Sequence, residues 1–496
     1  MHTFTYFCIK ESSMKNNLQR YTIFLGHLVF LILSIMSFIL ANERVLNMDP
    51  AYQLFYDINN QSILLSDHRY SMILSQLLPF LMIKCHAPLQ WVLYSYSFSF
   101  ILITYIIFII VVHGLKNYKA GCIMILSFIC MRATFFHSIS ETFQLIFYAS
   151  FFYAWWQFHP RQTLLSTIGY YFILFLSMSI CIFIHPIAVF FIAFVIGFSI
   201  FQERFTINRQ IIIGSIFLLL LFIFKLSLTE SGSHDASFIP DKTTFKYILS
   251  NFFHLYSLHF FYHHFISLYL FPSLLCLITS CIYIRKKQWL KLLFTIGFIS
   301  FFFLLSVVVY YKGDGDIGME RTYLPLIFFI GIPFFEDSFP CFSNKQSYFL
   351  LIFMGLLTLF SLYKTYTYGN WYSARLQKYD EIAKVVQQTH AHHLIIKRNE
   401  AAQIIDPLTW ETAIGTIIYS AIYMPDNIWT LFIEDDDYEW GKQDFDFNNG
   451  EYFLSVNWWR WWSKKDLNPR YFTLPPEPYK ILSYKNGNYY LSEIPK

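Results

Sequence analysis

The chain has 496 residues, of which 56% are hydrophobic and only 14% are charged, and its formal net charge is +4. Soluble domains carry about 25% charged residues, so this composition and a mean hydropathy of +0.43 exclude an ordinary soluble protein. The small net charge gives no argument for nucleic-acid binding. Length and composition together predict a polytopic α-helical membrane protein.

Eleven apolar runs are long enough to be transmembrane helices. The hydrocarbon core of a bilayer is about 30 Å thick and needs about 20 apolar residues per helix, fewer where neighbouring protein covers the ends. The first run is too long for the core of a signal peptide, so we expect an uncleaved anchor. None of the runs contains Asp or Glu. They are 21–41, 88–112, 121–136, 143–158, 164–184, 187–201, 211–228, 265–284, 292–311, 323–335 and 347–366.

The distribution of Lys and Arg predicts that the N-terminus lies inside. Short inner loops are enriched in these residues. With the N-terminus inside, about 60 residues of inner loop carry 13 of them, against 7 in about 101 residues of outer loop. Eleven spans then place the C-terminus outside, and the long outer segments are 42–87, 229–264 and 312–322. All cysteines except Cys85 fall in spans or on the inner side, so no disulfide framework is expected.

The tail from 367 to 496 is polar and has no run long enough to cross a bilayer, which predicts a small α/β domain outside the membrane, distinct from the transmembrane domain 1–366. Apolar residues at helical spacing predict a helix over 371–389, and 393–397 is expected to be a strand. Two further runs, 479–484 and 489–492, flank Asn486-Gly487. They predict a hairpin, because Asn-Gly accepts the positive φ angles of a tight turn.

The first outer loop contains a candidate catalytic group. Asp49 lies eight residues past the first span, near the expected membrane surface, where a carboxylate can accept a proton from a hydroxyl group. The alternative is that Asp49 caps a helix beginning at Pro50. Asp57 is a second acidic candidate in this loop. The apolar stretch 69–83 is too short to cross and is expected to lie in the interface or to re-enter.

The outer loop between the ninth and tenth spans carries a candidate anion site. Arg321 is expected at a helix start beside the bilayer, where its guanidinium can hold a phosphate through two parallel hydrogen bonds. Glu320 is a neighbouring candidate. Asp314 and Asp316 are candidate ligands for a divalent metal ion, although two carboxylates among glycines also fit a solvated turn.

Three basic residues, Arg132, Lys225 and Lys364, lie within the predicted spans near their outer ends. Snorkelling to the lipid headgroups accounts for such positions. The alternative is that they join Arg321 in a cationic ring that binds a lipid-linked phosphate.

Polar residues at other helix ends are further candidates. His137 and Glu141 precede the fourth span, and His185 lies in the turn between the fifth and sixth. Each is either a helix cap or part of a site. The spacing of His259 and His263 suits two zinc ligands on one helical face, but His254 and His264 beside them fit an aromatic interfacial helix equally well.

Two features of the tail have open interpretations. The acidic run 434–437 is expected to be a solvated loop. The aromatic run Trp458, Trp459, Trp461 and Trp462 suits stacking on sugar rings, packing inside the domain or contact with headgroups.

An uncleaved first span, an acidic outer loop directly after it, many spans and an outer α/β tail together resemble the GT-C superfamily of integral-membrane glycosyltransferases. The segment Glu320-Arg321-Thr322-Tyr323-Leu324-Pro325 is similar to the Arg-Tyr-Leu-Leu-Pro stretch of the mannosyltransferase and aminoarabinose-transferase type, with Thr322 as an interruption. Pro50 follows Asp49 where the family has an acidic pair.

The resemblance implies transfer of a sugar from a polyprenyl-phosphate donor to a glycan, lipid or protein acceptor on the outer face. Asp49 would act as the general base and Arg321 would hold the donor phosphate, which is then stabilised as it leaves. The abundance of Phe, Ile, Lys and Asn suits an AT-rich genome, so a bacterial inner membrane is expected.

Other classes remain open at the level of sequence. A polysaccharide (O-antigen) polymerase or flippase-like protein shares the many spans and outer Arg residues, and a non-enzymatic membrane interaction protein would use the Trp-rich tail. A secondary transporter is disfavoured, because ionisable groups are expected near the midplane in that class and the predicted spans contain no carboxylate.

Overall fold

The computed structural model describes residues 2–65, 67–158, 163–203, 205–229, 241–313, 315–405, 410–434, 450–456 and 459–494. Within them, eight helical segments are long and apolar enough to cross a membrane, so the chain is a polytopic helical protein suited to a bilayer. These segments are Asn17–Ile39, Leu89–Gly114, Leu164–Ile184, Arg209–Leu228, Phe265–Arg285, Trp289–Val309, Gly315–Cys341 and Asn344–Thr389.

The eight segments match eight of the eleven predicted spans. The other three, at 121–136, 143–158 and 187–201, correspond to shorter helices, namely α6 (Tyr118–Ser127), α7 (Glu141–Trp156) and α9 (Ala188–Gln202). Most side chains of α6 and α7 are buried among neighbouring helices. A helix covered by protein needs less length than one that faces lipid, so their number of crossings stays a prediction.

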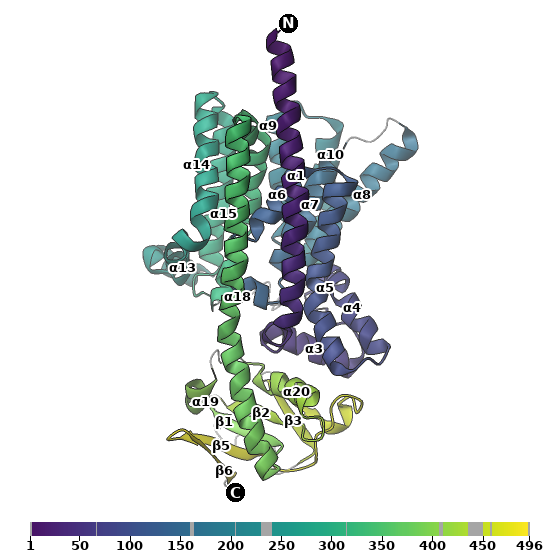
Figure 1. Cartoon of the computed structure of the whole chain (residues 1–496), viewed down its shortest axis with the longest axis vertical. Coiled ribbons are helices and arrows are strands. Elements are labelled where there is room, and N and C mark those ends of the chain that lie inside the picture. Colours follow the sequence, from purple (N-terminus) through teal and green to yellow (C-terminus); the bar gives the residue numbers. More distant parts are fainter. Residues whose placement is uncertain are drawn as a thin grey trace.

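The helices form an elongated bundle, with α1 (His2–Ile39) and α18 (Asn344–Thr389) running along its long axis (Figure 1). The β-strands gather at the end of the molecule far from the start of α1. The remaining helices are α2 (Ala41–Val45), α3 (Met48–Asn60), α4 (Ile73–Lys84), α5 (Leu89–Ile109), α8 (Leu164–Ile184), α10 (Arg209–Leu228), α12 (Lys242–Ser250), α13 (Tyr256–His263), α14 (Leu270–Arg285), α15 (Trp289–Val309), α16 (Gly315–Tyr323), α17 (Leu326–Pro333), α19 (Arg398–Ile404) and α20 (Thr412–Tyr423).

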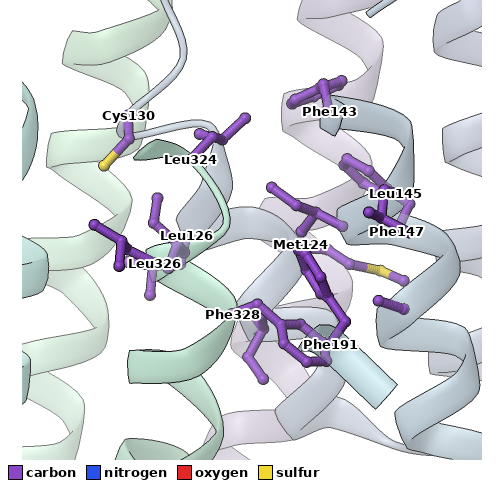
Figure 2. Close-up of a cluster of buried hydrophobic side chains, with 14 of the residues drawn as sticks. Met124, Leu126, Cys130, Phe143, Leu145, Phe147, Phe191, Leu324, Leu326 and Phe328 are labelled. Atoms are coloured by element: carbon purple, nitrogen blue, oxygen red, sulfur yellow. The ribbon is translucent and has the colours of Figure 1, made fainter. Parts of the chain in front are cut away.

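Close packing of apolar and aromatic side chains holds the bundle together. Figure 2 shows one such cluster, in which Phe191 lies beside Phe328 and Phe147 lies beside Leu145. The rings of Phe191 and Phe328 are 4.9 Å apart between centroids. Where α1 meets α5, a Cβ at Gly26 would lie 2.0 Å from the ring of Phe108, so only glycine allows this approach.

The segment predicted as one span at 121–136 is broken, and that prediction was wrong. α6 ends at Ser127, and a separate 3-10 helix covers Ala133–Phe136. Buried Glu320 of α16 explains the break, because its carboxylate accepts the backbone N–H groups of Arg132, Ala133 and Thr134 at 2.7 to 2.9 Å. These amides therefore do not bond to the preceding turn of α6.

The expectation that carboxylates avoid the spans fails for Gly315–Cys341. Glu336 and Asp337 lie in a π-helical turn, Phe334–Ser338, that directly follows α17. Lys119 of α6 pairs with Glu336 at 2.7 Å, and Lys291 of α15 pairs with Asp337 at 2.7 Å. Lysines on two other helices thus compensate the charges and let this segment remain helical.

The tail forms the predicted elements. The strands are β1 (His393–Lys397), β2 (Thr430–Glu434), β3 (Tyr452–Val456), β4 (Trp459–Ser463), β5 (Lys480–Lys485) and β6 (Asn488–Glu493). One sheet has the order β2-β1-β5-β6, with parallel pairs on both sides of β1, and β3 pairs with β4. The strand at 393–397 and the hairpin are confirmed, with Asn486 and Gly487 at φ values of 52° and 80°. The helix over 371–389 is the end of α18.

α3 forms the junction between bundle and sheet. Asn59 accepts the Asn468 N–H at 2.8 Å and donates to the Asp466 carbonyl at 2.9 Å. On the same helix, the ring of Phe55 lies 5.3 Å from that of Phe472. Because eight of the thirteen α3 residues are buried, the segment after the first span is held between the two parts and is not a free loop.

Candidate functional site

Asp49 lies in the first turn of α3, whose N-cap is Asn47. The prediction that Asp49 caps a helix starting at Pro50 is therefore wrong, since the helix begins at Met48. The Asp49 side chain is 50% exposed, and its Oδ2 lies 3.4 Å from Nε2 of buried His137. An accessible carboxylate beside an imidazole has the geometry expected of a proton acceptor.

Glu141 opens α7, four residues after His137. Arg69 donates from Nη1 to Glu141 Oε1 at 2.6 Å, with both side chains nearly buried. Burial alone would raise the pKa of Glu141, but the charges of Arg69, Arg321 and His185 lower it to about 2. Glu141 is therefore ionised and lies within electrostatic reach of three basic side chains.

The turn that carries Arg69 also meets Lys225. Asp67 and His68 both have positive φ angles, 48° and 54°, which non-glycine residues adopt mainly in constrained turns. The ammonium group of Lys225, in the last turn of α10, donates to the Asp67 carbonyl at 2.6 Å. Lys225 is 4% exposed, so it is held inward against this turn and does not snorkel to the surface.

Arg321 lies in the last turn of α16, not at a helix start as expected. Its charge acts on Glu141. The carboxylate of Glu320 beside it instead accepts the backbone N–H groups at 132–134. Of the two candidates, Arg321 acts on Glu141 and Glu320 has a structural role. His185 ends α8, and its Nδ1 accepts the Ile187 N–H at 3.2 Å.

The basic residues of the predicted cationic ring do not all lie together. Arg132 donates to Nδ1 of His264 at 3.3 Å, and its guanidinium lies 5.4 Å from the ring centroid of Tyr368. Asp316 acts electrostatically on His264 from α16. This forms a second polar cluster on the far side of α16. Lys364 is exposed on α18, with its ammonium 5.5 Å from the ring of Phe360, so no described contact brings it to Arg321.

Asp57 is fully buried and accepts the Leu64 N–H at 2.8 Å. Burial raises the pKa of this carboxyl well above its usual value. It fixes the turn after α3, and no contact among the described residues joins it to the Asp49 side chain. Its role is therefore structural.

The metal hypotheses gain no support from the described ranges, because no group of three or more His, Cys, Asp or Glu is placed there to hold a metal ion. Asp314 lies outside the described residues. His259 and His263 stack with ring centroids 6.3 Å apart. In the tail, Glu434 is buried in β2 and not in a loop, whereas 435–437 and Trp458 fall outside the described residues. Trp459, Trp461 and Trp462 belong to β4.

Two arginines of the first outer segment escaped prediction. Arg69 completes the Glu141 pair, and Arg44 of α2 is fully buried with its guanidinium 4.0 Å from the centroid of the Phe135 ring. Burial lowers the pKa of Arg44 to about 9. The sequence carries a signal for these two residues, because 42–87 contains only Arg44, Arg69 and Lys84 as Arg or Lys. A charged side chain isolated in apolar surroundings usually has a partner.

No family model, curated protein or solved structure matches this chain. The class of protein that the fold defines is a multi-pass helical membrane protein. The resemblance to the GT-C superfamily stays a hypothesis drawn from sequence, and function has to be argued from the site.

Proposed function

We propose that the protein is a glycosyltransferase that moves a sugar from a polyprenyl-phosphate donor to an acceptor on the outer face of a bacterial inner membrane, with the N-terminus inside and the C-terminus outside. The observation that carries the proposal is the contact between half-exposed Asp49 and buried His137, which lies four residues before Glu141, whose ionisation Arg69 and Arg321 support. We take the proton acceptor and the fixed positive charges to act on one substrate.

The chemistry follows from these positions. Asp49 takes the proton of the attacking hydroxyl as it bonds to the anomeric carbon, and His137 stabilises the ionised carboxylate beforehand. As the bond from sugar to phosphate breaks, negative charge grows on the leaving polyprenyl phosphate. Arg321, Arg69 and Lys225 supply positive charge that is already in place, which is the most effective kind of stabilisation.

The location of the basic groups suits a lipid donor. Lys225 lies in the last turn of α10, which is one of the eight apolar segments, and Arg321 ends the short helix before α17. A phosphate carried by a membrane lipid remains at the ends of such helices. Of the four predicted phosphate ligands, Arg321 and Lys225 are kept in this role, Arg69 is added, and Arg132 and Lys364 are left out.

Asp49→Asn tests the proposal, because the amide keeps the size and polarity of the side chain but cannot take a proton. We expect turnover of a radiolabelled undecaprenyl-phosphate sugar to fall by a factor of about 100 or more. The measurement uses the purified full chain in nanodiscs with a panel of donor sugars and membrane extract as the source of acceptor.

Asp426→Asn is the matched control, since Asp426 is an exposed carboxylate near the end of α20. It should transfer sugar at the parental rate. If Asp49→Asn stays within a few-fold of the parent, or if the parent consumes no donor of the panel, the proposal is refuted.

A further inference from the structure

A separate cavity lies on the predicted outer side, between α12, α13 and the end of α15. Its volume is about 480 Å³, and polar and aromatic side chains from three segments converge on it, including Thr244, Tyr247, His254, Tyr256, Tyr311 and Lys312. A cavity of this size holds a small molecule of one or two rings. Neither the sequence analysis nor the transfer site accounts for it.

The walls present flat rings next to a single cation. Tyr247 and Tyr311 meet edge to face with centroids 6.1 Å apart, and the ammonium of Lys312 lies 5.5 Å from the centroid of Tyr311. Tyr247 is 55% and Tyr256 43% exposed, so ring faces are available to a ligand. Lys312 is the one charged side chain in the described lining.

The cavity wall is anchored. Ser257 donates its hydroxyl to the Val307 carbonyl at 3.0 Å, and Tyr323 of α16 donates to the Ser257 carbonyl at 2.8 Å. Gly313 has φ +82°, and a Cβ there would lie 2.1 Å from the Tyr256 ring. The loop after Lys312 therefore needs glycine to let Tyr256 approach, and the lining is held in place before any ligand binds.

We infer that this cavity binds a saccharide with an acidic substituent, such as a phosphate or a carboxylate. Aromatic faces suit the apolar C–H side of a pyranose ring, the Thr244 hydroxyl and the imidazole of His254 can bond its hydroxyl groups, and Lys312 suits its negative charge. A bare anion would not use the tyrosines, and an apolar ligand would not use Lys312.

The assignment rests on the proposed function and names the substrate class that the same protein handles. The loop after Lys312 leads straight into α16, and Gly315 is six residues before Arg321, roughly 9 Å along the helix axis. That separation is about the length of one to two sugar units. The cavity and Arg321 are thus connected through one short helix.

The test uses glucose 1-phosphate as the probe, with glucose and inorganic phosphate for comparison, and the full chain in phosphatidylcholine nanodiscs. Saturation-transfer NMR reports contact between sugar protons and the rings, and calorimetry gives the affinity. We expect glucose 1-phosphate to bind more tightly than either part alone. Lys312→Met should weaken it about tenfold or more, and Tyr247→Leu should remove the saturation transfer. Lys246→Met is the control, because Lys246 is exposed on the same helix but does not line the cavity.

Phosphate binding as tightly as glucose 1-phosphate, equal affinity of parent and Lys312→Met, or no binding would overturn the inference. An acidic sugar-like ligand could be a glycan or a lipid headgroup, and measuring the affinity for glucose 1-phosphate again in phosphatidylglycerol nanodiscs distinguishes the two. Unchanged affinity there assigns the cavity to a glycan, and weakening assigns it to a lipid headgroup that competes. Binding of glucose 1-phosphate is measured without the polyprenyl-phosphate donor, so it is independent of sugar transfer. Loss of transfer in Asp49→Asn together with retained binding of glucose 1-phosphate supports both proposals. Retained transfer in Asp49→Asn refutes only the proposed function, and absent binding with lost transfer refutes only this inference.

Discussion

At the residue scale, the Arg69–Glu141 ion pair joins the turn after α3 to the first turn of α7. Both side chains are nearly buried, with exposed fractions of 11% and 13%, so solvent screens the attraction only weakly. The folded protein therefore gains stability from ionised Glu141 that the unfolded chain lacks.

This ion pair makes the free energy of unfolding depend on pH. The pKa of Glu141 is about 2 in the folded chain, against a usual value of 4.5. The stabilisation, about 3 kcal/mol by linkage, is present above pH about 4.5 and is lost as the pH falls towards 2. We expect Glu141→Gln to lower the unfolding temperature at neutral pH and to flatten its decline between pH 4.5 and 2.

Thermal unfolding of the detergent-solubilised chain across this pH range checks the expectation. Glu493→Gln, which changes an exposed carboxylate at the end of β6, should leave both the stability and its pH dependence as in the parent. A parallel pH profile for Glu141→Gln and the parent would show that the ion pair contributes nothing.

The sequence pointed to Asp49, Glu141, His137 and Arg321 as candidates, because polar groups are rare beside long apolar runs. It missed their partners. Arg69 and Glu141 are separated by 72 positions, and no local pattern specifies which charges meet across such a distance. Lys364 was grouped with Arg321 only because both were predicted near the outer membrane surface. Position along a helix does not specify which side of the helix a residue lies on.

At the element scale, the π-helical turn at Phe334–Ser338 ties separate helices together. Besides Lys291, Asp337 accepts the Tyr283 hydroxyl at 2.5 Å and the Gln202 amide at 3.0 Å. Helices α9, α14 and α15 thus meet at one carboxylate. π-helical turns break the regular helix spacing and often occur where a side chain has a special role.

Lys291→Met tests this junction. The change leaves Asp337 ionised and without its cation in a nearly buried position, so we expect a loss of about 3 kcal/mol in the free energy of unfolding. The double variant Lys291→Met with Asp337→Asn should recover most of it, since the amide keeps hydrogen bonding without the charge.

Denaturant unfolding in detergent micelles gives the comparison. Lys345→Met, at an exposed position near the start of α18, should remain within about 0.5 kcal/mol of the parent. Equal losses for the single and double variants would mean that the helices do not depend on this charge pair.

Elements set by local chemistry were predictable. The strand at 393–397 and the Asn-Gly hairpin follow from neighbouring residues alone, as does the helical spacing of Tyr379, Ile382 and Val386. The break after α6 was not, because Glu320 causes it from a position 186 to 188 residues away. Apolar composition looks the same in a continuous helix and in an interrupted one.

At the scale of the whole molecule, the start of α1 and the β-sheet lie at opposite ends of the long axis (Figure 1). An odd number of crossings would produce such an arrangement, and the number of spans predicted from the sequence, eleven, is odd. The excess of Lys and Arg in the predicted inner loops predicts which end faces the cytoplasm.

Fusions to a reporter that is active only outside the cytoplasm test the orientation. We expect activity when the reporter follows Lys496 and none when it follows Lys287, which lies in the short turn between α14 and α15. A fusion after Lys84 serves as a second outer position. Activity after Lys287 and silence at the C-terminus would reverse the orientation and remove the transfer site from the outer face.

The single continuous helix α18 spans 46 residues, roughly 69 Å at 1.5 Å per residue. Its N-terminal turns pack in the bundle, and its C-terminal turns carry Tyr379 and Ile382 into the core beneath the sheet. Arg132 packs on Tyr368 of that same helix. The core beneath the sheet and the Arg132 cluster in the bundle are therefore joined by one unbroken rod of backbone.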